Sequence, residues 1–76
     1  MTENVQTVIN GHLSICPDLE TLPENTLQSF ASVYTRLCNP DTFSLKDAIC
    51  HLDFLRIHCI DMAHIGFWSD MVDSLN

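Results

Sequence analysis

Histidine and cysteine side chains gather in one stretch of the sequence, residues 44–65. This stretch holds three of the four histidines and two of the four cysteines. These residue types bind transition metals, transfer protons and act as nucleophiles. The stretch also lies in the longest run without glycine or proline, which predicts one long helix. What these groups can do together depends on the faces of that helix on which they lie.

The spacing of these groups does not favour a metal site. Zinc ligands usually come in units such as C-x2-4-C or H-x3-5-H that converge on one ion. His51 and His58 are seven residues apart, which is about 10 Å along a helix. Cys50 and Cys59, like His58 and His64, point from different faces. The sequence therefore predicts no metal ligand and no cofactor. A metal-dependent assembly built from His51 and His58 of two chains is kept as a second alternative.

Catalysis has no support in the sequence. A nucleophile needs an adjacent base and an orienting group, and Cys50 and His51, although neighbours, point about 100° apart on a helix. No G-x-S-x-G, H-E-x-x-H or glycine-rich phosphate loop is present. We expect no enzyme and no catalytic residue. The histidines are expected to be structural or solvated, with Asp47 and Asp61 at helical neighbour distance from His51 and His64.

Charge and composition bound the function further. Three basic residues oppose ten acidic ones, for a net charge of −7. This composition disfavours direct binding to nucleic acid or to an anionic membrane and would attract a basic partner. The first residues lack the pattern of a signal peptide and no run is long enough to span a membrane, so a cytoplasmic location is expected. Reduced cysteines are expected there.

The chain is short for its apolar content. With 76 residues, 46% of them hydrophobic, it is predicted to form one domain, 1–76, that buries a modest share of its surface. Some apolar surface is then expected at an interface, and a homodimer is the commonest way to cover it.

The first half of the sequence predicts two helices. Apolar positions at helical spacing predict a short helix within residues 2–16, with Thr2 as N-cap and fraying near Gly11. Asn10-Gly11 is also a hairpin signal, which is the alternative. Residues 17–22 form a linker whose leucines tuck under the helices. A helix over 23–38 follows, opened by a capping box of Thr21 and Glu24. Its apolar face consists of Leu27, Phe30, Ala31, Tyr34, Leu37 and Cys38.

The second half predicts a helix over 44–65 that starts at Ser44 as N-cap, with Gly66 ending or bending it and a helical tail after it. The short turn before Ser44 predicts an antiparallel hairpin with residues 23–38. One face of the long helix is expected to pack on that partner. The opposite patch and the tail remain for an interface, and Arg56 projects from the packed face itself. The candidate interface residues are Cys50, Phe54, Arg56, Ile57, Ile65, Phe67, Trp68 and Met71.

The sequence thus predicts an all-α fold: a small helical bundle built on an antiparallel helical hairpin (23–38 and 44–65), with a short N-terminal helix and a helical C-terminal tail. The predicted function is a noncatalytic protein–protein interaction module. It would act as a homo-oligomer that binds and modulates another protein, in the manner of small regulatory or accessory proteins of phages. The first alternative is an acidic mimic of nucleic acid that inhibits a DNA- or RNA-binding protein.

Overall fold

The chain folds into four α-helices and one short 3-10 helix. The computed structural model describes residues 2–76, with side chains from Val5 onward, and has no strand in that range. The elements, in chain order, are α1 (Thr2–His12), η1 (Pro17–Thr21), α2 (Glu24–Cys38), α3 (Leu45–His58) and α4 (Met62–Leu75). The predicted all-α fold is confirmed. None of the described helices is long and apolar enough to cross a membrane.

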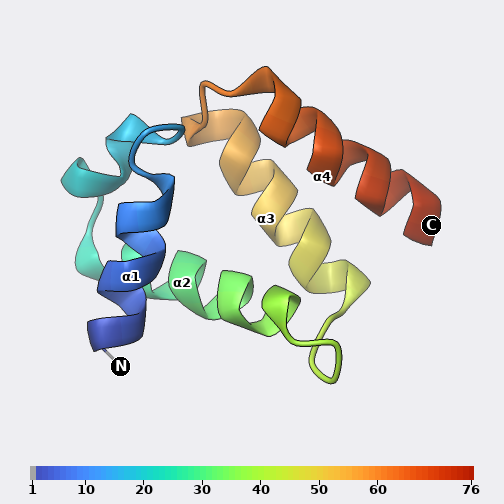
Figure 1. Ribbon diagram of the computed structural model, residues 1–76, viewed down its shortest axis with the longest axis horizontal. Coiled ribbons are helices and arrows are strands. Elements are labelled where there is room, and N and C mark those ends of the chain that lie inside the picture. Colours follow the sequence, from blue (N-terminus) through green and yellow to red (C-terminus); the bar gives the residue numbers. More distant parts are fainter. Residues whose placement is uncertain (1) are drawn as a thin grey trace.

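Helices that follow one another in the sequence also pack together in space. α1 packs on α2, α2 on α3, and α3 on α4, while η1 contacts both α1 and α3. Figure 1 shows that α4 returns alongside α3, whereas α2 and α3 meet at their connection and diverge toward the N-terminal segment. The predicted pairing of the second and third helices is confirmed. The N-terminal segment bridges the wide end of this pair.

Apolar side chains from every helix form one core. Leu19 and Leu55 have no exposed surface, and Cys16 is equally buried. Burying such side chains contributes about 1.5–3 kcal/mol each. The other buried members are Ile9, Phe30, Leu37, Ala48, Leu52, Trp68 and Val72.

The N-terminal segment is helical, and the hairpin alternative does not form. α1 ends at His12, and the backbone N–H of Cys16 then donates to the His12 carbonyl at 2.7 Å. The side chain of Thr2, the expected N-cap, lies outside the described side chains. The predicted linker contains η1, whose Leu19 is fully buried as expected.

The predicted capping box at the start of α2 is wrong. The N-cap is Pro23, and no side chain caps the helix. Thr21 lies at the end of η1, where its hydroxyl donates to the Asp18 carbonyl at 2.9 Å. The Thr21 side chain, which the sequence pattern predicts as the cap of α2, therefore bonds within the 3-10 helix instead. The predicted apolar face of α2 is buried at Phe30, Ala31 and Leu37, but Cys38 is exposed.

The start of α3 is as predicted, but the single helix over 44–65 is wrong. The Ser44 hydroxyl accepts the N–H of Asp47 at 3.2 Å, so Ser44 is the N-cap. After the fourteen residues of α3 the chain turns extended at Cys59, and Asp61 caps a new helix by accepting the N–H groups of Ala63 and His64.

Gly66 does not end a helix, and its backbone angles are ordinary. It lies inside α4, and no described glycine has a positive φ. The break occurs at 59–61 because the N–H of Ile60 is drawn to the Ile15 carbonyl, at 2.7 Å, a contact from a distant part of the chain.

Candidate metal centre

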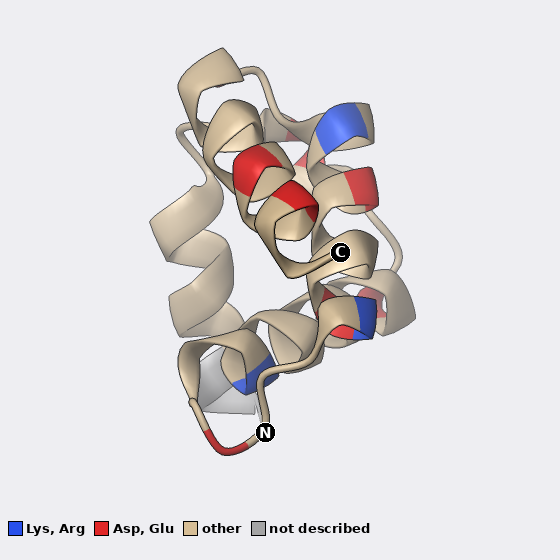
Figure 2. Ribbon diagram, turned by 90° about the vertical axis from the view of Figure 1, so that its right-hand side faces the viewer, with Lys and Arg blue, Asp and Glu red and all other residues tan. Residues whose placement is uncertain are grey.

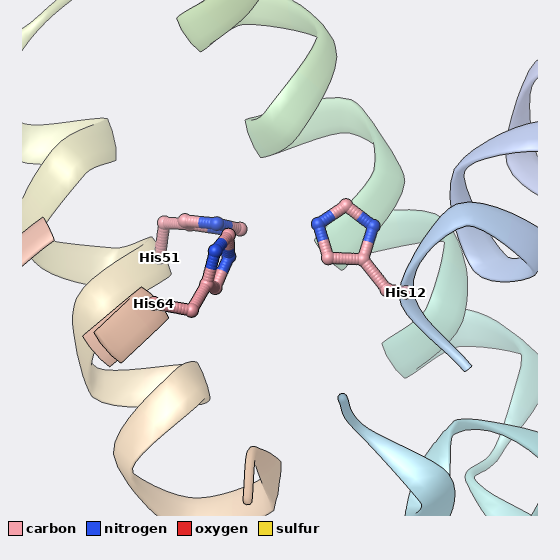
Figure 3. Close-up of side chains that lie close together, drawn as sticks. All are labelled: His12, His51 and His64. Atoms are coloured by element: carbon pink, nitrogen blue, oxygen red, sulfur yellow. The ribbon is translucent and has the colours of Figure 1, made fainter. Parts of the chain in front are cut away.

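Three histidines from three different helices meet in the interior. His12 comes from the end of α1, His51 from the middle of α3 and His64 from the first turn of α4. One ring nitrogen from each lies within 4.8 Å of the others. Figure 3 shows His51 and His64 side by side, with the His12 ring facing them from the opposite side.

The backbone fixes the tautomer of His12. Its Nδ1 lies 2.9 Å from the Val8 carbonyl oxygen, four residues earlier in α1. A carbonyl can only accept, so Nδ1 carries the proton and donates it. In the neutral ring the lone pair is therefore on Nε2. A metal-binding histidine is usually oriented in this way, by a hydrogen bond from its other nitrogen to a carbonyl or carboxylate.

His51 is buried without hydrogen-bond partners. It is 1% exposed, and neither of its ring nitrogens has a partner among the described residues. Aromatic rings surround it: Phe30 stacks on it with centroids 5.5 Å apart, and Trp68 meets it edge-on at 4.8 Å. Leaving a buried polar group unpaired costs about 1–3 kcal/mol. The cost indicates that His51 has a role beyond filling space.

His64 completes the cluster from the start of α4, next to the break between α3 and α4. Its Nε2 is buried and has no partner within the described part of the chain, while its backbone N–H is held by the Asp61 carboxylate at 3.3 Å. The break between α3 and α4 thus sets the position of His64. In one continuous helix, 13 residues would separate it from His51, about 20 Å along the axis.

The surroundings keep these rings neutral. Burial, followed by the proximity of His12 and His64, lowers the pKa of His51 to about 4. Burial, followed by His12, also lowers the pKa of His64, with Asp61 acting in the opposite direction. A histidine must be neutral to bind a metal ion. Near neutral pH, His51 and His64 therefore offer lone pairs.

The geometry fits a small transition-metal ion. Three imidazoles around Zn²⁺ place their nitrogens about 2.0–2.1 Å from the ion, and hence about 3.3 Å from one another. The present separations, at most 4.8 Å, require a closure of roughly 1.5 Å or less, which side-chain rotation can supply. Three neutral ligands leave the charge of the ion uncompensated. A fourth ligand such as hydroxide would compensate it in part, and the net charge of −7 favours cations at longer range.

An apolar groove between α2 and α3 lies beside the cluster. It has a volume of about 230 Å³, and His51 forms part of its wall. The other lining residues are Thr26, Ser29, Phe30, Val33, Cys50 and Phe54. The groove borders His51 alone among the three histidines, and the ring nitrogens of His51 are buried.

The candidate interface residues differ in exposure. Cys50 and Arg56 are exposed, with Arg56 3.9 Å from the Asp53 carboxylate, and Ile57 and Phe67 are 72% and 56% exposed. Trp68 lies in the core. Phe54, Ile65 and Met71 are half-buried and pack against it.

The pairing expected for two histidines is wrong. Asp47 binds Arg36 at 2.9 Å and leaves His51 without a carboxylate. The Asp61 carboxylate accepts backbone N–H groups of α4 instead of binding the His64 ring. The sequence reasoning missed the cluster because it compared only histidines of one supposed helix. Two signals were present: His12 falls on the apolar side of the N-terminal helix, and Asp61 is a residue type that begins helices.

The chain matches no family model, no curated protein and no solved structure, so the chemistry of the site rests on its geometry.

Proposed function

We propose that this protein binds one Zn²⁺ ion through His12, His51 and His64. The observation that carries the proposal is the convergence of three histidines in the interior, where His51 has no other partner for either nitrogen within residues 2–76. Imidazole ligands suit zinc, and three of them with one open position form a known zinc coordination set.

The ion would act by holding helices together. Each ligand belongs to a different helix, so binding ties the end of α1 to α3 and α4. We propose no reaction at the metal. The ligand set contains no carboxylate. The rings nearest His51 are Trp68, Phe30 and Tyr34; only Tyr34 is ionisable, and burial raises the pKa of its hydroxyl, which makes it a poor general base.

Zinc titration of the metal-free protein tests this proposal. Isothermal titration calorimetry should give one ion per chain. Thermal unfolding at a free zinc concentration of about 100 times Kd should gain about 2.7 kcal/mol. In a chain of this size that gain raises Tm by about 10–20 °C.

Matched variants identify the ligands. His51→Leu should lower zinc affinity by more than about 100-fold, because even outer partners of a metal-binding histidine account for 10–100-fold. His58→Ala is the control, since His58 lies outside the cluster, 3.5 Å from Asp18, and should bind as the natural chain does. Absence of binding, or equal losses in both variants, would contradict the proposal.

A second candidate function is a protein–protein interaction module. Three large apolar side chains at the α3–α4 junction, Ile57, Ile60 and Met62, are 72%, 68% and 76% exposed. We call them the junction patch. The proposed occupant is a second copy of the chain, because identical patches pair by two-fold symmetry. This partner would give the homodimer that the composition predicts.

Sedimentation tests the junction patch. The natural chain should dimerise at micromolar concentration, and Ile60→Ser should shift it toward monomer. Ile49→Ser, at an exposed position elsewhere on α3, is the control. A monomeric natural chain would refute self-association through the patch. Binding of a basic peptide to that monomer would instead support a partner of opposite charge.

The acidic mimic remains a weaker proposal. Figure 2 shows acidic positions on several helices and loops of one face, mixed with basic ones, without one continuous band. A mimic presents dense carboxylates, and its complexes weaken steeply with salt.

A further inference from the structure

Two cysteines lie at the point where the N-terminal segment meets the α3–α4 junction. The N–H of Ile60 donates to the Ile15 carbonyl at 2.7 Å. These groups belong to the peptide bonds Ile15–Cys16 and Cys59–Ile60. The Cα atom of Cys16 therefore lies three covalent bonds from the accepting oxygen, and that of Cys59 lies two bonds from the donating nitrogen, so the backbone itself brings the two residues together.

The two thiols also lie close to each other. Cys16 is fully buried and Cys59 is half-buried, and the Cys59 thiol is near enough to act on the pKa of Cys16. Burial, followed by the Cys59 thiol, raises the pKa of the Cys16 thiol to about 12. The Cys59 sulfur also accepts the N–H of Asp61 at 3.4 Å. One member of the pair is thus shielded as a thiol, and the other is partly accessible.

We propose that Cys16 and Cys59 form a reversible disulfide that locks the end of α1 to the α3–α4 junction. Disulfides need Cα atoms about 4.4–6.8 Å apart, and the short hydrogen bond between Ile15 and Ile60 brings the backbones of the two cysteines toward that range. The other two cysteines, Cys38 and Cys50, are exposed and belong to α2 and α3.

The chemistry balances with a small-molecule disulfide such as oxidised glutathione. The Cys59 thiolate attacks one of its sulfurs, forms a mixed disulfide and releases one glutathione thiolate. Cys16 then gives its proton to solvent and attacks the Cys59 sulfur, which releases the second glutathione. Two protein thiols lose two electrons, and oxidised glutathione is reduced to two thiols. Cys59 reacts first because it is partly accessible, whereas Cys16 is buried and holds its proton.

The disulfide would close a long loop that contains all of α2 and α3. Constraining a loop of this length stabilises the folded chain, and we expect Tm to rise by at least about 10 °C. The proposal does not depend on zinc, because neither cysteine belongs to the histidine cluster.

The test uses the folded full chain in glutathione buffers of increasing oxidising strength, without metal. Samples are quenched by alkylation and mapped by mass spectrometry. The expected product has lost two hydrogens, contains a peptide linking Cys16 to Cys59, and is alkylated at Cys38 and Cys50. The Cys38→Ser/Cys50→Ser double variant is the matched control and should form the same link, with the same rise in Tm.

Cys59→Ser should lose both the link and the Tm rise while keeping zinc binding. Two results would overturn the proposal. One is that Cys16 and Cys59 stay reduced in buffers that glutathionylate Cys38 and Cys50. The other is that the link forms only after urea unfolds the chain.

Discussion

Two groups of titratable side chains in this protein are built in opposite ways. At the rim of the α2–α3 contact, Arg36 binds Asp47 through two hydrogen bonds of 2.9 and 3.1 Å. In the interior, His12, His51 and His64 face one another. His12 Nδ1 donates to the Val8 carbonyl, whereas both ring nitrogens of His51 and the Nε2 of His64 have no hydrogen-bond partner within residues 2–76.

This contrast in hydrogen bonding indicates which group of side chains could bind a ligand. Ion pairs at an exposed rim contribute little to stability because water and salt screen them. Buried nitrogens without partners reduce stability, and His51 and His64 carry three of them next to His12, where a bound ligand could pair with them. The rim pair has its partners within the chain, and the proposed zinc ion would supply the partner that the histidine nitrogens lack.

The largest effect is expected at the support of the cluster. Leu55, on the same helix as His51, has no exposed surface. Leu55→Ala should lower the free energy of unfolding by about 2–5 kcal/mol, through lost burial and the cavity left behind. Urea denaturation measures it. A loss below about 1 kcal/mol would mean that the interior around the cluster is loosely packed.

Acid should destabilise the metal-free protein over the pH range between the unfolded and folded pKa values of His51. The unfolded chain binds this proton with the ordinary pKa of 6.5, whereas burial, followed by His12 and His64, lowers the folded pKa to about 4. The unfolded state therefore binds more protons between these values. The stability is fully present above pH 6.5 and is lost as the pH falls toward 4, by on the order of 3 kcal/mol. Urea titrations in chelator at several pH values measure this loss, and His51→Leu should flatten it. An equal slope in both proteins would contradict the assignment.

Replacing the buried polar ring should stabilise the metal-free protein. His51→Leu removes two unpaired nitrogens and fills a similar volume, so the free energy of unfolding in chelator should rise by about 1–3 kcal/mol. The variant should gain nothing from zinc. If it is instead less stable than the natural chain without metal, His51 already has a partner, and the contrast between the two groups is lost.

The smallest effect is expected at the rim. The Arg36 guanidinium, through its hydrogen bonds, lowers the pKa of Asp47. Asp47→Asn should cause a slight loss of stability that shrinks at high salt, and zinc affinity should not change. Thermal melts at two ionic strengths test the first part, and calorimetry tests the second. A change in zinc affinity would mean that the rim and the cluster are coupled.

Much of the fold could be predicted from local chemistry. Ser44 caps α3 as predicted because the pattern lies within four residues, and the spacing of Phe30, Ala31 and Leu37 fixes the face of α2. These signals do not depend on distant parts of the chain.

The rest depended largely on contacts between distant parts of the chain, although Asp61 is a local signal for the start of a helix. The break at 59–61 relies on the bond from Ile60 to Ile15, far away in the sequence. Without that break His64 would lie too far from His51, and without the tertiary fold His12 would lie in a separate segment. The candidate metal centre therefore could not be predicted from spacing alone.

X-ray absorption at the zinc edge tests directly whether His12, His51 and His64 hold the ion. With one equivalent of Zn²⁺ bound, the account predicts four nitrogen or oxygen neighbours at about 2.0 Å, with the multiple-scattering pattern of three imidazoles. The same spectrum should be found for His58→Ala. A six-coordinate shell of oxygens, or the signature of a single imidazole, would contradict a zinc ion held by His12, His51 and His64.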